Sequence, residues 1–392
     1  MLLVKNARLL TMAGREFQNG YVAADKGKIT ELGDDAAELK KLEAECNEVI
    51  DVKGHYVVPG FVDAHCHVGM CEDSVGFEGD DGNEMTDPVT PHLRAIDAVY
   101  HADRAFQEAL EGGVTTVVTG PGSANVIGGQ FAALKTFGRR VEDMLIREPV
   151  AMKVAFGENP KSIYHEKRQS PMTRMATAAI LRESLMKARE YQQMLDDYER
   201  DSENYDKPDF DMKLEALLKV LKGEIPLKAH AHRADDILTA IRIAKEFGVR
   251  ITIEHCTEGH LITDILREEK VNVITGPFLT DRSKIELKNQ SIKAPGIISK
   301  AGIKTAIMTD HPCTPVQYLP LCAAVAVKEG MGEEEALKAI TINAAEITGI
   351  ADRVGSLETG KDADMVIMDG HPLELRSRVL YTIINGQVVY RV

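Results

Sequence analysis

The sequence predicts an α/β protein in which a (β/α)8 barrel of the TIM type carries a small β-sandwich domain formed by both termini. Two features of the 392-residue chain predict this fold. Short apolar runs and helical patterns alternate through the middle of the chain, which is the rhythm of parallel βα units. Segments rich in β-formers and turn residues occupy both ends, so the two ends together predict one small β domain.

The central alternation predicts the barrel over residues 59–349. Amphipathic patterns at residues 92–113, 234–248, 257–270 and 332–349 read as helices between the apolar runs. Seven apolar runs read as strands, and one further run is a possible eighth strand. Eight βα units fit a barrel of this length with insertions. In chain order the runs are GFVDAHCH, GVTTVVTGPG, IGGQFAALKT (the eighth), PVAMKVAFG, IPLKAHAH, VRITIEHC, VNVITGP and IKTAIMTD.

The chain ends predict the composite β-sandwich domain from residues 1–58 and 350–392. The first segment alternates β-formers with Gly, Asn and Asp, and one helical stretch at residues 34–46 interrupts it. The last segment returns to the same pattern. Its Asn385-Gly386 pair predicts a two-residue β-hairpin turn.

A helical insertion is predicted at about residues 159–222, between two barrel strands. Residues 171–195 place apolar side chains on one helical face, residues 196–209 read as a charged, solvated loop, and residues 210–223 read as a second helix. The insertion either packs on the side of the barrel or forms a lid, because loops at the carboxyl face of such barrels often cover the pocket. The sequence leaves both alternatives open.

Composition and charge limit the classes of function. Lys and Arg number 47 against 61 Asp and Glu, a net charge of −14, which argues against nucleic acid or an acidic membrane surface as a partner. No apolar run reaches the roughly 18 residues of a membrane span, and the start lacks the long apolar region of a signal peptide. Six scattered cysteines do not make a disulfide framework, so we expect a reduced, cytoplasmic location.

Ligand-type side chains follow the apolar runs where the predicted strands end. Reactive residues of a βα barrel come from the carboxyl ends of its strands, and imidazole and carboxylate groups bind catalytic zinc and related divalent ions. One such side chain alone is most often a hydrogen-bonded residue or a helix N-cap. Their joint occurrence at separate strand ends predicts a metal site. The residues are His65, His67, Lys153, His230, His232, His255 and Asp310.

The motif PGFVDAHCH, followed by the later strand-end histidines and Asp310, resembles the amidohydrolase superfamily. Residues 337–350 and 356–369 resemble the last helix and the closing segment of members with a split β domain. Within the superfamily, the sequence is most similar to imidazolonepropionase-like metal-dependent hydrolases, a group that includes dipeptidases and prolidase-like enzymes. The resemblance covers essentially the whole chain and is weak for the substrate.

The resemblance implies two divalent ions per chain, expected to be zinc. His65 and His67 are implied to bind the more buried ion, and His230 and His255 the second. Asp310 is implied to contact the first ion and to act as the general base.

For two positions of the implied metal centre, the sequence offers an alternative residue. Lys153 matches the strand-four lysine that binuclear members carboxylate with CO2, so that its carbamate bridges both ions; Glu158 is the rival bridging carboxylate. His232 is the alternative to His230 as a ligand. We otherwise expect His232 to contact the substrate or to support the metal site.

The predicted reaction is hydrolysis of an amide- or peptide-type C–N bond by a metal-bridging hydroxide, with Asp310 as the general base. The substrate is expected to be a small molecule such as a dipeptide or an N-acyl amino acid. Tyr164 and Arg168 are candidate substrate-binding residues, the arginine for a carboxylate; ordinary surface positions are the alternative. The glycine-rich segment 119–130 lacks the ending of a phosphate-binding loop and is expected to line the pocket.

Two other functions stay open. One is a mononuclear deaminase or a cyclic-amide (imidazolone-type) hydrolase, although Arg233 stands where many such members carry a glutamate, three residues after the strand-five histidine. The other is a non-catalytic scaffold, which would be expected to lose ligand residues that this chain retains. Homo-oligomers are common in such families, and the sequence demonstrates none.

Overall fold

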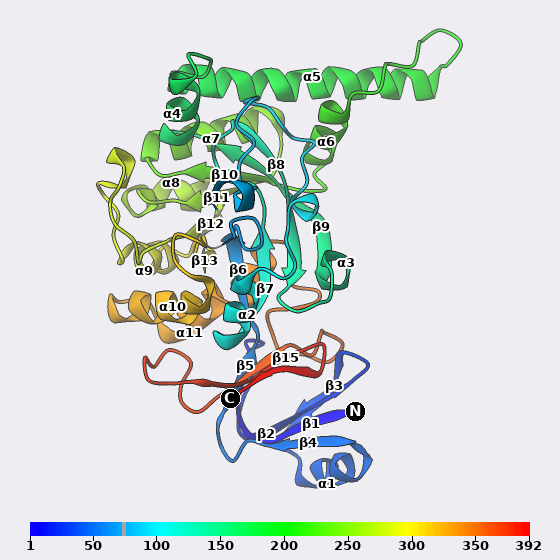
Figure 1. The fold of residues 1–392 in the computed structure, drawn as a ribbon, viewed down its shortest axis with the longest axis vertical. Coiled ribbons are helices and arrows are strands. Elements are labelled where there is room, and N and C mark those ends of the chain that lie inside the picture. Colours follow the sequence, from blue (N-terminus) through cyan, green and yellow to red (C-terminus); the bar gives the residue numbers. More distant parts are fainter. Residues whose placement is uncertain (73–75) are drawn as a thin grey trace.

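The computed structural model describes residues 1–72 and 76–392 and contains two eight-stranded sheets. One, the barrel sheet, curls into a nearly closed barrel; the other, the terminal sheet, combines strands from both ends of the chain. Figure 1 shows the terminal sheet at one end of the molecule, the barrel in the middle, and the long helix α5 (Arg174–Arg200) at the far end.

The barrel sheet keeps its strands in sequence order from β6 to β13. Its two edge strands approach each other beyond their ends, where His67 N donates to His311 O at 2.9 Å and Asp310 N donates to His65 O at 3.2 Å. The strands are β6 (Phe61–Cys66), β7 (Val114–Thr119), β8 (Ile127–Lys135), β9 (Leu145–Ala155), β10 (Leu227–Ala231), β11 (Ile251–His255), β12 (Asn272–Thr275) and β13 (Thr305–Ile307).

Strand β8 runs antiparallel to both β7 and β9, so the prediction of eight parallel βα units is wrong at this strand. The connection at residues 120–126 is too short for a parallel crossover, which needs about a dozen residues or more. Between β8 and β9 the structure has only the short helix α3 (Val141–Met144). The barrel is therefore a mixed sheet.

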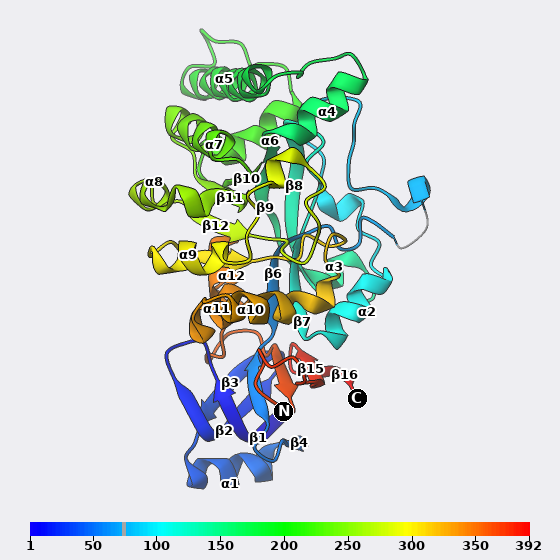
Figure 2. The same cartoon turned by 90° about the vertical axis from the view of Figure 1, so that its left-hand side faces the viewer.

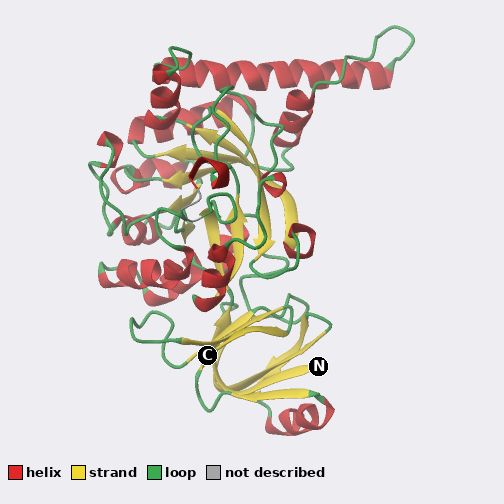
Figure 3. Cartoon of the chain, viewed as in Figure 1, coloured by secondary structure: helices red, strands yellow, loops and turns green. Residues whose placement is uncertain are grey.

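Helices cover the outside of the barrel. Figure 2 shows α7, α8, α9, α10 and α11 stacked one after another along one side of the strands, and Figure 3 shows the same separation of helices and strands by colour. Three predicted helices are shorter than expected, and the one predicted at 257–270 is an α-helix only at Thr263–Glu268. The covering helices are α2 (Arg104–Glu111), α7 (Ala234–Phe247), α8 (Thr263–Glu268), α9 (Ala294–Lys300), α10 (Leu319–Lys328), α11 (Glu333–Ala339) and α12 (Ile342–Ile347).

Two of the three shortened helices have local causes. The pattern at 92–113 forms a 3-10 turn at Ala95–Asp97 and becomes α-helical only at α2. The Asp103 side chain caps α2 by accepting from Ala105 N at 2.9 Å. The pattern at 332–349 divides into α11 and α12, because Thr341 between them adopts a non-helical backbone with φ −139° and ψ −102°.

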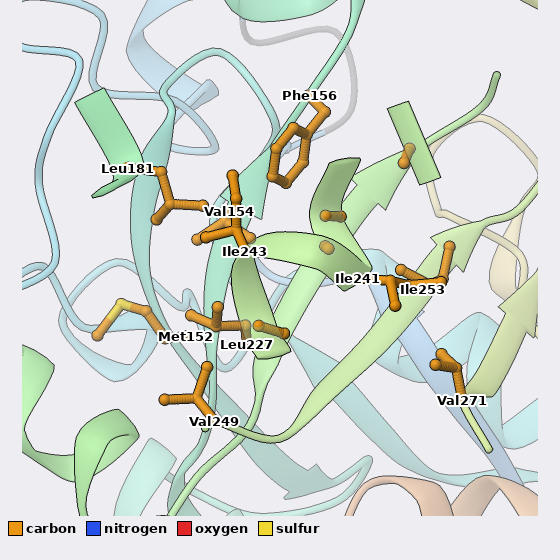
Figure 4. Packing of buried hydrophobic residues seen from close by; sticks show 14 of the residues in the cluster. Met152, Val154, Phe156, Leu181, Leu227, Ile241, Ile243, Val249, Ile253 and Val271 are labelled. Atoms are coloured by element: carbon orange, nitrogen blue, oxygen red, sulfur yellow. The ribbon is translucent and has the colours of Figure 1, made fainter. Parts of the chain in front are cut away.

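The region predicted as an insertion contains α4 (Glu158–Glu166), α5 and α6 (Met212–Leu221). Helix α5 continues through Arg200, so the charged stretch predicted as a loop begins as helix. The buried face of α5 packs on the side of the barrel: Figure 4 shows Leu181 beside Val154 of β9 and Ile243 of α7, all within one buried cluster.

The terminal sheet has the order β16-β15-β14-β5-β1-β2-β3, with β4 paired to β1. Antiparallel pairing of β5 with β14 joins the two chain ends, and Asn385 and Gly386 both have positive φ, as the predicted hairpin turn requires. The sandwich layering and the domain boundaries stay predictions. The elements are β1 (Leu2–Leu10), β2 (Glu16–Asp25), β3 (Lys28–Gly33), α1 (Ala36–Glu45), β4 (Glu48–Asp51), β5 (Tyr56–Pro59), β14 (Met365–Met368), β15 (Val379–Ile384) and β16 (Gln387–Arg391).

A buried cluster of ion pairs connects the barrel to the terminal sheet. Lys135, at the end of β8, lies with its Nζ 2.9 Å from Asp362 Oδ2 and also pairs with Asp364, which leads into β14. Lys28 Nζ and Arg353 Nη2 reach Asp362 at 2.6 Å and 2.8 Å. Because three cations surround it, Asp362 is a compensated buried charge.

Across residues 1–72 and 76–392, no helix is both long enough and apolar enough to cross a membrane.

Candidate metal centre

Two groups of ligand-type side chains gather at the ends of four barrel strands. In each group, the potential ligand atoms all lie within 4.8 Å of one another. Members of both groups line one pocket of about 220 Å³. The first group is His65, His67 and Asp310, and the second is His230, His232 and His255.

Strand pairing and backbone bends bring these residues together. The parallel register of β10 and β11 sets Ala231 opposite His255, so the histidines of the two strand ends become neighbours. His255 and Asp310 have φ values of 63° and 53°, in the left-handed region that non-glycine residues seldom adopt. Such conformations are concentrated at functional sites, where they redirect a side chain.

Hydrogen bonds hold the histidine rings of both groups by Nδ1. His67 Nδ1 lies 2.6 Å from Gly120 O, and His255 Nδ1 lies 2.9 Å from Gly276 O. A carbonyl oxygen only accepts, so each Nδ1 carries the proton and each Nε2 keeps its lone pair. This is the tautomer that a metal ion binds through Nε2.

In the first group, the spacing of the ligand atoms fits a divalent ion. Asp310 Oδ1 lies 3.4 Å from His67 Nε2 and 3.7 Å from His65 Nε2. Two ligand atoms at about 2.1 Å from a tetrahedral zinc ion would be about 3.4 Å apart. Although burial alone would raise it, the neighbouring His255 and His67 hold the pKa of Asp310 well below its usual range, so the carboxylate is ionised.

In the second group, the three imidazoles pack with ring centroids 4.3–4.7 Å apart. His230 Nε2 is buried and lacks a hydrogen-bond partner in the described part of the chain. A buried polar atom of this kind is costly unless something binds it, and a metal ion satisfies the requirement.

Burial keeps four of the five histidines neutral. It lowers the pKa of His65, His230 and His232 well below the usual value, and that of His255 to about 4. Neutral imidazole is the form that coordinates metal, so the donor set of both groups suits a divalent ion.

Lys153 of β9 lines the same pocket as the histidines. Its Nζ lies 3.1 Å from His65 Nε2 and 5.4 Å from the centroid of the Phe131 ring. Among the described residues, no carboxylate lies within ion-pairing distance of this ammonium group. Burial lowers the pKa of Lys153 to about 8.

Glu254 and Lys228 lie directly behind the candidate metal centre, and the sequence interpretation missed both. Glu254 Oε2 lies 2.8 Å from His65 Nδ1 and 2.9 Å from Lys228 Nζ, and all three side chains are buried. Glu254 therefore fixes the ring of His65, as carboxylates do behind metal-bound histidines. The signal in the sequence was a charged residue in an apolar strand run, directly before His255.

The two predicted substrate-binding residues lie away from the pocket. The Tyr164 hydroxyl is buried and donates to Asn125 Oδ1 at 2.6 Å, because this face of α4 packs inward. Arg168 is exposed beyond the end of α4. Neither lines the pocket, and their substrate-binding role stays a prediction. Glu158 also lies outside it and borders a neighbouring cavity.

The remaining pocket wall comes from loops. Segment 119–130 contributes Gly122 and Ser123, in line with the pocket-lining role predicted for it, and α4 contributes Asn159 alone from the insertion. The other lining residues are His67, Asn83, Lys153, His230, His232, His255, Thr257, Gly276, Pro277, Thr280, Ser283, Lys284, Leu287, Gln290, Asp310 and Cys313.

The barrel, the two ligand groups and the buried lysine define a metal-dependent hydrolase of C–N bonds. Residues 56–389 match the model of the Amidohydrolase family, and the chain belongs to this family. The resemblance predicted from the motifs is confirmed.

Known relatives cover most of the chain. A solved amidohydrolase from Thermotoga maritima is 42% identical, superposes with a TM-score of 0.95, and matches over the whole of both chains. An imidazolonepropionase of Fusobacterium nucleatum is 24% identical over 90% of this chain and 85% of its own. Amidohydrolase tasK of Hapsidospora irregularis is 28% identical over 94% of this chain. The matched region is only 39% of that larger protein.

Proposed function

We propose that this amidohydrolase is binuclear and hydrolyses an amide- or peptide-type C–N bond in a small substrate, such as a dipeptide or an N-acyl amino acid. The observation that carries the proposal is the meeting of two three-residue ligand groups and the buried Lys153 at one pocket. The family membership supports the reaction class, and the site supports the metal number.

In this proposal, His65, His67 and Asp310 hold one ion. His230 and His255 hold the second ion, since His230 Nε2 has no other partner in the described residues. Nitrogen and oxygen donors of this kind suit zinc.

Lys153 is the proposed bridging residue. Its neutral amine would add to CO2 and lose a proton, which gives a carbamate with two oxygen donors. The absence of a carboxylate partner in the described residues and the 3.1 Å approach to His65 support this role. Glu158 is less suitable, because it lies outside the pocket.

Bound ions would supply Lewis acidity, which polarises a carbonyl and lowers the pKa of a water molecule. Asp310, which lines the pocket, would accept the proton of the attacking water and return it to the leaving nitrogen. His232 Nδ1 lies 2.7 Å from Thr257 Oγ1, and this hydrogen bond orients the His232 ring in the pocket. We assign His232 to substrate contact. The products are a carboxylic acid and an amine.

A second candidate is a mononuclear cyclic-amide hydrolase or deaminase. The name of the Fusobacterium relative supports it, and either three-residue group has enough ligands for a single ion. The number of bound ions and the substrate class separate the two candidates.

The proposed reaction is tested with zinc-loaded protein and a panel of dipeptides, N-acetyl amino acids, cyclic amides and aminopurines. We expect hydrolysis of linear amides, and we expect Asp310→Asn to lower kcat by about 10²- to 10⁴-fold. Asp264→Asn, at an exposed position on α8, is the control. Turnover of ring substrates alone would favour the second candidate. Full linear-amide activity in Asp310→Asn would refute the general-base assignment.

A further inference from the structure

Lys284 places a positive charge without a carboxylate partner on the wall of the metal-site pocket. It follows β12 in a loop and lines the same pocket as His230, His232 and His255. Its Nζ donates to Asn159 Oδ1 at 2.5 Å. No carboxylate in the described residues lies within 4.0 Å of this Nζ. An ammonium group has three donors, so two remain for a ligand.

Ser123 adds a further donor beside Lys284. Asn159 Nδ2 donates to Ser123 Oγ at 2.5 Å, which leaves the hydroxyl hydrogen of Ser123 free to point into the pocket. The three residues come from three segments: the β7–β8 connection, the start of α4 and the loop after β12. A Cβ at Gly122 would lie 2.5 Å from Asn83, so the backbone beside Ser123 is closely packed.

The same residues separate two cavities of different charge. Lys284, Asn159 and Ser123 line both the metal-site pocket and an outer cavity of about 420 Å³. The outer cavity carries the carboxylates of Asp80 and Glu158, whereas among the described residues only Asp310 brings a carboxylate to the lining of the inner pocket. Glu286 lies behind that lining, with Oε1 3.7 Å from His232 Nε2. An anion beside Lys284 is therefore repelled less on the inner side.

We propose that Lys284 and Ser123 form an anion subsite that binds a carboxylate of the substrate while its C–N bond lies at the histidine groups. The inference rests on the proposed function and narrows it to small amides with a free carboxylate. The pocket volume of about 220 Å³ is below the roughly 300 Å³ of drug-sized sites, which also indicates a small substrate. In this proposal, Lys284 binds the substrate carboxylate, which is the role that the sequence predicted for Arg168.

The first test compares matched substrates. Wild-type protein, Lys284→Met and Ser123→Ala are assayed on the best dipeptide and on its C-terminal amide, with the products identified by mass spectrometry. We expect Lys284→Met to lower the ratio of kcat/KM for the acid over the amide by about 10- to 100-fold, mainly through KM. Lys288→Met, on an exposed lysine of the same loop, keeps the wild-type ratio. An unchanged ratio in Lys284→Met overturns the subsite.

The second test measures binding without turnover. Ligand-observed NMR on the metal-loaded protein compares N-acetylglycine with N-acetylglycinamide, and we expect a preference for the acid that Lys284→Met reduces by about tenfold. A preference that survives in Lys284→Met, or no preference in the wild type, refutes the inference. If no amide in the panel is hydrolysed but the Lys284-dependent preference is present, the proposed reaction fails and the anion subsite stands.

Discussion

Nδ1 of His65 lies 2.8 Å from Oε2 of Glu254, and both side chains are completely buried. The same carboxylate oxygen lies 2.9 Å from Lys228 Nζ, while Oε1 accepts from the Thr252 hydroxyl at 2.6 Å. Because this carboxylate holds the Nδ1 proton, His65 presents Nε2 to Lys153 and Asp310. Glu254 is thus expected to position His65 in the metal centre, although it contacts Nδ1 of that ring and not the Nε2 that would bind the ion.

Glu254→Gln is expected to weaken metal binding by about 10- to 100-fold, since residues that orient ligand histidines have effects of this size. The neutral amide is a poorer acceptor for His65 and no longer compensates the charge of Lys228. The measurement is a zinc titration in competition with a chelator. Glu268→Gln, on an exposed glutamate of α8, is the control. Equal zinc affinity in Glu254→Gln and wild type would contradict the positioning role.

Tyr164→Phe is expected to lower the free energy of unfolding by about 1–3 kcal/mol, because it leaves the buried Asn125 Oδ1 without its donor. KM should stay at the wild-type value, and Arg168→Ala should change neither quantity, since Arg168 is exposed. Denaturant unfolding and steady-state kinetics check both variants. A tenfold higher KM with wild-type stability in either variant would restore the substrate-binding role predicted from the sequence.

Asp362→Asn should destabilise the protein by about 3 kcal/mol near neutral pH, since it breaks a buried ion pair. Although burial alone would raise it, Lys135 and the other surrounding cations hold the pKa of Asp362 below its usual value. A lowered pKa in the folded state contributes stability above the unfolded pKa of about 3.9, and this contribution is lost as the pH falls through the folded value.

The gap in melting temperature between wild type and Asp362→Asn should therefore be largest above about pH 4 and should shrink below it. Thermal unfolding from pH 7 down to pH 3 measures the gap. Asp352→Asn removes a mostly exposed partner of Arg147 and should show little effect at any pH. A gap that is constant with pH would show that the Asp362 charge contributes nothing.

Helix α5 offers a matched pair of neighbouring positions. Leu185 is fully buried, and Met186 is 54% exposed. Leu185→Ala should cost about 2–5 kcal/mol of unfolding free energy, whereas Met186→Ala should stay within about 0.5 kcal/mol. Denaturant unfolding of both variants makes the comparison. Equal stabilities would mean that α5 does not belong to the cooperative core of the barrel.

The grouping of the candidate ligand residues was predictable because their position follows from strand periodicity. His65, His230 and His255 each end an apolar run, and the carboxyl ends of neighbouring strands meet at one face. The direction of β8 was also readable, since the connection at residues 120–126 is too short for a crossover. The apolar pattern of a strand is the same in either direction, so the pattern alone does not set the direction of β8.

Other parts of the site depend on tertiary structure. Glu254 and Lys228 lie in apolar runs, and only the closed barrel shows that their side chains meet behind His65. Lys284 stands in a loop without periodicity, so its approach to Asn159 is set by two distant segments. Tyr164 is close in sequence to β9, but the face of α4 that packs inward decides its role.

Metal content distinguishes a bridged, binuclear centre from a mononuclear one. Wild type, Lys153→Met and the control Lys167→Met, on an exposed lysine just after α4, are purified without chelator, supplied with zinc and analysed by elemental mass spectrometry. We expect about two ions per chain in the wild type and the control, as in two-metal hydrolytic sites, and about one in Lys153→Met. About one ion per chain in the wild type, or two in Lys153→Met, would contradict the bridging lysine.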